Sequence, residues 1–395
     1  MSYWGALEPL GQSLVLPAIV KLSQMGADIT LLSFEKPGDL ANETEVKRVR
    51  LILEEAGVRW IWLKYHPRIP ATVYDGLHGI VRGIRQRLNE KFDIVHGRTY
   101  IASTFAVFLA PLVGAKYIDH SEGFYPDEQV DGGVWGYNSP IHRTTKYLER
   151  LKFARADGIV ALSNRAKAEI ENLPVVKRRK TPVIFVPSCV DLERFKFAKT
   201  ESVGRNGGEL KFVYIGSVGA RYTLDNIGRF VSNINQEKNR VRLQVYSKAD
   251  PELIKKMLTD GGLSESSYQL SAVPYAEMPA YLARHDVGLF FLTQGISEHG
   301  CSPTKIGEYW AVGLPVITTP NVSDTDEIIR RRKVGVILEN QTEAAYTDAF
   351  RQIRELLKDP ELAVRCRLAA EEHYSLAAAC ERQMVLYEQL AGKSA

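Results

Sequence analysis

Residues 301–319 read CSPTKIGEYWAVGLPVITT, and this stretch predicts a loop, a short helix and a buried strand in close succession. Ser302 is a good N-cap residue, Pro303 suits the first helical position, and Gly313 suits the position just after the last turn. The run that starts at Pro315 is apolar and β-branched, which is typical of a parallel strand. Strand and helix alternation of this kind is typical of an α/β domain.

The start of this helix is also a candidate binding site. The N-terminus of a helix offers free N–H groups and a positive dipole end to an anion. Thr304 and Glu308 are four residues apart and share one helix face, so a carboxylate lies one turn behind the anion. Lys305 either adds positive charge for a diphosphate or is an ordinary exposed lysine. The pattern predicts a nucleotide site, with phosphates at the helix start and a ribose diol on Glu308.

The bulk properties are those of an ordinary globular protein. The 395 residues favour two domains, and the contents of 45% hydrophobic and 25% charged residues are unremarkable in a soluble chain. A net charge of +4 is too small by itself to indicate nucleic-acid binding. The sequence lacks both a long apolar run and the pattern of a signal peptide, and its four cysteines have no metal-ligand spacing. We therefore expect a cytoplasmic protein with reduced thiols.

Predicted strands and helices alternate along almost the whole chain. Strands are expected at 27–34, 60–63, 93–96, 116–119, 158–162, 183–186, 211–215, 241–246, 287–291 and 315–318. Helices are expected at 45–55, 74–91 and 139–156, among others. We expect two Rossmann-like doubly wound domains, with ligands at the carboxyl ends of their strands and the cleft between the domains as the default site.

The domain boundaries follow from the composition of the linker. Residues 1–196 form the first domain, 197–209 a polar, glycine-containing linker, and 210–373 the second domain, while 374–395 form a last helix that returns to the first domain. Only four residues precede the first glycine-bearing turn, where a buried strand is expected. We therefore expect the first strand to be largely missing from this sequence.

Both domains open with a glycine-bearing turn ahead of a helix. The first turn carries Gly11 and Gln12, and the second carries Gly216 and Ser217. Such turns let the backbone approach a phosphate, although many are merely tight connections. Arg221 follows the second turn, where it would either hold phosphate oxygens or lie on the surface.

Other polar residues are candidates on position alone. His120 ends a predicted strand and is either a site residue or structural, and His96 and Arg98 at the neighbouring strand end are weaker candidates. Asp127 and Glu128 lie in a predicted loop, where they would meet a polyhydroxylated acceptor or cap the helix near residue 139.

Two further patterns have an ordinary and a functional interpretation. The string Asp324-Thr-Asp326 would bind a divalent metal or simply start a helix. The helix with Arg82, Arg85, Arg87 and Lys91 has apolar residues on another face, listed as Leu77, Ile80, Val81, Ile84 and Leu88. It either packs its apolar face on the sheet, which we favour, or contacts an anionic membrane surface.

Three segments together resemble a known family. Residues 186–195 (VPSCVDLERF), 214–219 (YIGSVG) and 302–316 (SPTKIGEYWAVGLPV) resemble the retaining glycosyltransferases of family four, which have the GT-B fold of two Rossmann-like domains. Residues 374–390 look like the last helix of such enzymes. The resemblance covers nearly the whole chain.

The resemblance implies roles for individual positions. It gives Glu308 the ribose hydroxyls and places Val273 near the base. Residues expected beside the donor phosphates are Ser302, Thr304, Gly11 and Gln12, and Gly216 and Ser217 are further residues expected to bind the donor. His120 is expected near the donor sugar.

Two positions depart from the family pattern. Gly300 stands eight residues before Glu308, where the family has a second glutamate, so that Glu298 is the nearest acid for the sugar. The family's usual arginine is Ser217 here. We therefore assign Arg221 and Lys305 to the leaving diphosphate.

The predicted function is that of a retaining, metal-independent glycosyltransferase without a cofactor. It would use a nucleotide-diphosphate sugar and the hydroxyl of a sugar, glycan or lipid-linked acceptor, in glycan, polysaccharide or glycolipid synthesis. A peripheral location at the inner membrane face is compatible with the basic helix. Alternatives are a nucleotide-sugar epimerase of the same architecture, a non-catalytic nucleotide-sugar-binding protein and, third, a Rossmann dehydrogenase, for which the G-x-G-x-x-G motif is lacking.

Overall fold

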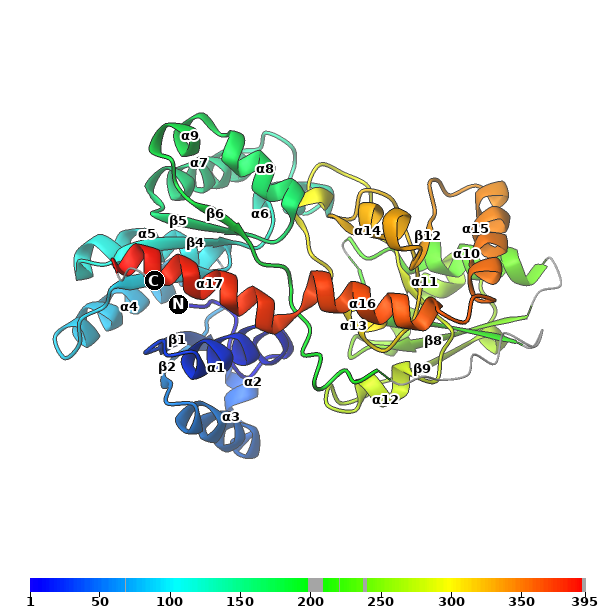
Figure 1. Cartoon of the computed structure of the whole chain (residues 1–395), viewed down its shortest axis with the longest axis horizontal. Coiled ribbons are helices and arrows are strands. Elements are labelled where there is room, and N and C mark those ends of the chain that lie inside the picture. Colours follow the sequence, from blue (N-terminus) through cyan, green and yellow to red (C-terminus); the bar gives the residue numbers. More distant parts are fainter. Residues whose placement is uncertain (68, 198–208, 220, 237–239, 393–395) are drawn as a thin grey trace. The chain divides into compact units, whose positions relative to one another are not determined.

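The computed structural model describes residues 1–67, 69–197, 209–219, 221–236 and 240–392. The chain forms two compact units, each an α/β unit around a parallel sheet (Figure 1). The first unit comprises Met1–Pro126, Gly136–Cys189 and Leu376–Ala395, and the second comprises Asp127–Trp135 and Val190–Ser375. The predicted α/β class with two Rossmann-like domains is therefore confirmed. Most of the predicted linker lies outside the described residues.

The first sheet consists of parallel strands joined by helical crossovers. Its strands are β1 (Thr30–Glu35), β2 (Arg59–Lys64), β3 (Ile94–Arg98), β4 (Lys116–Ser121), β5 (Gly158–Ala161) and β6 (Val183–Phe185). Strand β1 pairs with β2, and the order of the other four strands is β3-β4-β5-β6. Each of the six overlaps a predicted strand with ends that differ by up to three residues. The central strands of a parallel sheet are continuous apolar runs, which makes them recognisable in the sequence.

Helices cover both faces of the first sheet. They are α1 (Leu16–Gln24), α2 (Pro37–Leu40), α3 (Glu43–Glu55), α4 (Ile69–Arg87), α5 (Tyr100–Val113), α7 (Pro140–Arg155), α8 (Asn164–Asn172), α9 (Pro174–Arg179) and α17 (Leu376–Ala391), with a π-helical turn at Gly11–Val15. Alternate residues of the central strands face opposite layers. Tyr117 and Ile159 pack with α5 and α7, whereas Ile118 and Val160 pack with Leu386 of α17.

The space between β1 and β3 is only partly filled. Ser2 forms parallel bridges with Ser33 of β1 and Arg98 of β3, so it connects the two parts of the sheet. A cavity of about 560 Å³ opens beside it, lined by residues of β1, β3, α1 and α17. The Met1 ammonium is buried there and donates to the His96 carbonyl at 2.8 Å. The expected missing strand stays a prediction.

The second unit has one six-stranded parallel sheet. Its strands are β7 (Leu210–Ile215), β8 (Val241–Tyr246), β9 (Tyr268–Ser271), β10 (Val287–Phe290), β11 (Val316–Thr318) and β12 (Gly335–Ile337), in the order β12-β11-β10-β7-β8-β9. The four predicted strands are present, and the two edge strands β9 and β12 were not predicted. Edge strands are short and half-exposed, so they lack the apolar run that marks the central strands.

The helices of the second unit enclose a single large core. They are α10 (Leu224–Gln236), α11 (Pro251–Asp260), α12 (Met278–Leu282), α13 (Thr304–Ala311), α14 (Thr325–Arg332), α15 (Glu343–Leu356) and α16 (Leu362–Tyr374), with 3-10 turns at Glu265–Ser267 and Glu298–Gly300. The buried rings of Trp310 and Tyr309 anchor α13 in this core. The sheet and α13 thus hold the start of that helix in a defined place.

The segment of residues 127–135 differs from its prediction. It was expected in a loop of the first domain, but it begins within a helix, α6 (Tyr125–Asp131), and its contacts assign it to the second unit. An ion pair from Glu128 to Arg221 and hydrogen bonds from Ser297 to Asp131 account for this assignment. The unit boundaries near Val190 and Ser375 lie close to the predicted ones.

Candidate functional site

Helix α13 starts later than the sequence predicts. Its first residue is Thr304, Pro303 occupies the N-cap position, and among the described residues no side chain forms a capping hydrogen bond. The prediction that Ser302 is the N-cap is wrong, because the helical backbone begins only after Pro303. The predicted end is confirmed: Gly313 has a φ of +90°, and Leu314 N–H donates to the Tyr309 carbonyl at 2.9 Å.

Glu308 lies within the second unit with only 5% of its surface exposed. The Tyr275 hydroxyl donates to its Oε1 at 2.9 Å, and the guanidinium of Arg194 lies 5.3 Å from the centre of the Tyr275 ring. Burial raises the pKa of Glu308 to about 7, against the opposing effects of the Tyr275 hydrogen bond and of Lys305. The Tyr275 hydrogen bond therefore holds the carboxylate in one orientation and leaves its other oxygen, Oε2, outside that hydrogen bond. Val273, two residues before Tyr275, is buried in the same loop.

Lys305 is half-buried among aromatic rings rather than exposed on the helix surface. Its Nζ lies 3.6 Å from the centre of the Tyr222 ring and 5.5 and 5.4 Å from those of Tyr214 and Phe290. The stem passes so close to Gly216 that a Cβ there would lie 2.2 Å from Lys305 Cε. Burial lowers the pKa of the ammonium to about 7, with Glu308 acting in the opposite direction. The expectation of an ordinary exposed lysine is excluded.

Arg221 is also inside the second unit, with 14% of its side chain exposed. Its Nη1 lies 3.4 Å from Glu128 Oε1. Its Nε and Nη2 are buried and have no hydrogen-bond partner in the described part of the chain. Buried donors without partners are costly and point to a ligand that satisfies them. Ser217, at the usual arginine position of the family, is exposed.

The loop before α13 is held by two carboxylates of the second unit. Asp131 accepts hydrogen bonds from the N–H groups of Ile296 and Ser297 at 3.0 and 2.9 Å. Glu298 is buried and accepts from the Gly295 N–H. Glu298 therefore stabilises its own loop, and its contact with a sugar stays a prediction, as does the acceptor contact of Asp127 and Glu128.

His120 lies in the first unit, at the end of β4. Its Nδ1 is 3.1 Å from Nε2 of His96, whose Nδ1 is 2.7 Å from the Tyr387 hydroxyl. Burial and the nearby Arg98 lower the pKa of His120 well below its usual value, so the ring is neutral near pH 7. Its Nε2 is buried without a partner in the described part of the chain. A neutral ring with one free nitrogen suits a hydrogen bond to a hydroxyl group.

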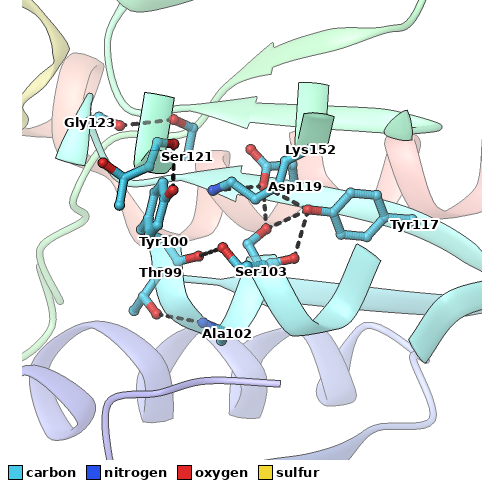
Figure 2. A network of polar contacts seen from close by, with 11 residues as sticks. Thr99, Tyr100, Ala102, Ser103, Tyr117, Asp119, Ser121, Gly123 and Lys152 are labelled. Atoms are coloured by element: carbon cyan, nitrogen blue, oxygen red, sulfur yellow. Dashed lines mark hydrogen bonds and ion pairs between the residues drawn. The ribbon is translucent and has the colours of Figure 1, made fainter. Parts of the chain in front are cut away.

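The opposite face of β4 carries a buried polar network that the sequence did not indicate (Figure 2). Asp119 accepts from the Tyr117 hydroxyl at 2.8 Å and from Ser103, and it forms an ion pair with Lys152 at 3.6 Å. The Lys152 Nζ lies 4.1 Å from the centre of the Tyr100 ring. This network connects β4 to α5 and α7 and so fixes the strand end that carries His120.

The first glycine turn is occupied by contacts of its own. Gln12 donates to Glu45 Oε1 at 2.7 Å and accepts from Arg48 at 2.9 Å. A Cβ on Gly11 would lie 1.8 Å from the Gly5 carbonyl oxygen. The close packing of the chain therefore already requires glycine at this position. The predicted phosphate contacts of Gly11 and Gln12 stay predictions.

Comparison with protein-family models decides the family. Residues 18–194 match the model described as Glycosyltransferase Family 4, and residues 209–359 match the one described as Glycosyl transferases group 1. The chain belongs to the group 1 glycosyltransferases of family 4. No protein with a curated description matches its sequence significantly.

Solved structures show the same fold as this glycosyltransferase. A glycosyltransferase from Rickettsia africae is 15% identical with a TM-score of 0.66, over 100% of this chain and 98% of that one. The sucrose-phosphate synthase of Thermosynechococcus elongatus is 14% identical with a TM-score of 0.69, over 95% and 92%. HepE of Anabaena, solved with UDP, is 13% identical with a TM-score of 0.68, over 98% of each chain. These proteins share the GT-B fold.

The aspartates suggested for a metal have an ordinary structural place in this glycosyltransferase. Asp326 is buried near the start of α14 and accepts from the Asn321 N–H at 2.9 Å. Within the described residues, no group of three or more His, Cys, Asp or Glu side chains is arranged to hold a metal ion. In the same part of the chain, none of the helices is long and apolar enough to cross a membrane.

Proposed function

We propose that this glycosyltransferase moves a sugar from a UDP-sugar to an acceptor hydroxyl, with retention of the anomeric configuration and without a metal. The observation that carries the proposal is that two buried nitrogens of Arg221, Nε and Nη2, have no partner in the described part of the chain, while the arginine interacts electrostatically with Cys301 just before α13. The identity of the base is supported by HepE of Anabaena, a protein of the same fold that was solved with UDP and with UDP-glucose.

The diphosphate would bind where Arg221, Lys305 and the start of α13 supply positive charge. Breaking the bond to the sugar leaves negative charge on the diphosphate, and fixed donors that face this charge lower the barrier. The half-buried environment of Lys305 strengthens the attraction because little water screens it. The absence of a side chain on Gly216 leaves room for the lysine stem.

The nucleoside would bind beside this charge. Glu308 would accept the ribose hydroxyls through the carboxylate that Tyr275 orients, while the base lies near Val273. Thr304 and Ser302 would flank the phosphates at the start of α13. These contacts fix the donor so that only its sugar is free to react.

The acceptor would attack from the side on which the diphosphate leaves, and the leaving phosphate would take the proton of its hydroxyl. The neutral His120 ring, with its free Nε2, would hydrogen-bond a hydroxyl of the donor sugar.

The acceptor would be a sugar, a glycan or a lipid-linked glycan in cytoplasmic polysaccharide or glycolipid synthesis. All four cysteines are free thiols, which supports that compartment.

Ligand screening followed by product analysis tests the proposal. UDP-sugars are expected to raise the melting temperature most in a panel of nucleotides and nucleotide sugars. With a mixture of acceptor sugars, the matching UDP-sugar should release UDP and give a glycoside whose anomeric proton shows the donor's configuration by NMR.

Variants then test whether Arg221 stabilises the negative charge of the leaving diphosphate. Arg221→Ala should lower kcat about a hundredfold, whereas Arg229→Ala, on the exposed surface of α10, should not. Unchanged turnover of Arg221→Ala, or conversion of the donor to its epimer without acceptor, would overturn the proposal.

A further inference from the structure

Helix α4 packs against the rest of the first unit through glycines. A Cβ on Gly76 would lie 2.1 Å from the Phe105 ring, and one on Gly83 would lie 2.7 Å from Leu109, both of them residues of α5. A Cβ on Gly79 would likewise meet other side chains of the first unit, at 2.9 Å. The spacing of these glycines places them on one face of the helix. This glycine face is the inner face of α4.

Most apolar side chains of α4 point the other way, although Ile80 packs against the core of the first unit. Val73, Leu77, Val81 and Ile84 are between 36% and 56% exposed, and Leu88, the residue directly after the helix, is 82% exposed. The spacing of three or four residues between the four helical ones makes a single stripe about 17 Å long, and Leu88 follows at its end. The favoured expectation was that Leu77, Ile80, Val81, Ile84 and Leu88 pack on the sheet. It is wrong for all of them except Ile80, because glycines occupy most of the packed face. A soluble helix normally buries such a stripe.

The exposed charge on α4 is positive. Arg82 and Arg85 are exposed beside the apolar stripe, and neither forms an ion pair with another residue of the described part of the chain. The two acids of this segment are engaged elsewhere: Asp75 is buried against His66, and Glu90 pairs with Arg59 at 2.7 Å. The apolar stripe therefore borders two arginines whose positive charge is not balanced by the acids of this segment.

We infer that this α4 face, the five apolar residues together with Arg82 and Arg85, lies on an anionic lipid bilayer. Apolar side chains bordered by arginines match a helix that lies in the plane of a membrane interface. Pairing with a second copy would bring the arginines of both chains together, and this repulsion disfavours a dimer through the same face. Acidic headgroups attract those arginines instead.

Sedimentation with vesicles tests the inference. The intact protein is expected to bind vesicles of equal parts phosphatidylglycerol and phosphatidylcholine at least tenfold more strongly than pure phosphatidylcholine vesicles. Arg82→Gln with Arg85→Gln should weaken anionic binding about 25-fold, at about fivefold for each arginine. Leu77→Asn with Val81→Asn and Leu88→Asn should weaken it at least tenfold.

Matched controls separate this surface from folding and from catalysis. Leu253→Asn on α11 and Arg330→Glu on α14 change exposed residues of the same types elsewhere and should leave vesicle binding unchanged. All variants should keep the melting temperature and the affinity for UDP-glucose, because the α4 face takes no part in the proposed reaction. Absence of vesicle binding, equal binding to both vesicle types, or a dimer that only the asparagine variant dissociates would overturn the inference.

Discussion

Lys305 should couple the binding of a nucleotide sugar to the uptake of a proton. Burial among three aromatic rings lowers the pKa of its ammonium to about 7. A diphosphate beside Nζ favours the charged form and raises this pKa, so binding above pH 7 requires a proton from solvent. The contribution of Lys305 to affinity is therefore complete below pH 7 and falls as the pH rises through the pKa of the free protein.

The size of the effect follows from that pKa. With a pKa of about 7, the protonated fraction of Lys305 falls from about 0.76 at pH 6.5 to about 0.03 at pH 8.5. The affinity for UDP-glucose that depends on this charge should thus fall about 25-fold over the same range. Glu308, whose pKa is raised to about 7, has the opposite dependence, because its carboxylate forms as the pH rises.

Isothermal titration calorimetry with UDP-glucose measures the effect, because neither phosphate of this donor titrates in the range. The variant Lys305→Met keeps the aliphatic stem and retains Glu308, so its pH profile is the reference. The ratio of wild-type to variant Kd should increase about 25-fold between pH 6.5 and 8.5. A ratio that stays constant with pH would refute the coupling of binding to protonation of Lys305. Equal affinities of the wild type and Lys305→Met at pH 6.5 would refute any charge contact between Lys305 and UDP-glucose.

Three other changes give distinct outcomes. Gly216→Ala places a Cβ against Lys305 and should lower kcat at least tenfold. The control Gly219→Ala has the same kind of positive φ but open space around it, so it should lower the stability of the fold without changing kcat. Equal kcat values in the two variants would contradict this. Tyr275→Phe removes a hydrogen bond that lowers the pKa of Glu308, so UDP-glucose affinity should fall about tenfold at pH 6.5 and less at pH 8.5, and an equal loss at both would contradict it. Fusing five β-branched apolar residues ahead of Met1 should raise the melting temperature by a few degrees, because these residues would enter the cavity beside Ser2. A glycine-serine extension of equal length is the control. An equal shift of the melting temperature with both extensions would contradict this placement.

The sequence predicted the fold where local patterns are strong. The central strands, such as β5 and β10, consist only of buried residues and are continuous apolar runs. The edge strands β9 and β12 were missed because alternation over three or four half-exposed residues is too weak to recognise. Helix α4 was predicted over residues 74–91 and is found at Ile69–Arg87, and its apolar stripe, except for Ile80, was assigned to the wrong side. A helical period identifies a stripe, and only the packing of Gly76 and Gly83 shows which side faces inward.

The candidate site was predicted in part for a similar reason. Glu308 and Lys305 could be named because they belong to one short segment with a helix start. Tyr275 could not, because its contact with Glu308 joins positions 33 residues apart. The unpartnered donors of Arg221 likewise depend on how the chain folds around them, although the position of the arginine after a glycine turn indicated a phosphate contact.

A crystal structure with UDP-glucose would test the central claim most directly, namely that the second unit holds the diphosphate with Arg221 and Lys305. Phosphate oxygens are expected within hydrogen-bond distance of Arg221 Nε and Nη2 and of Lys305 Nζ, with the ribose hydroxyls on Glu308. A bound UDP-glucose that leaves the Arg221 donors unpartnered, or that places its ribose away from Glu308, would contradict it.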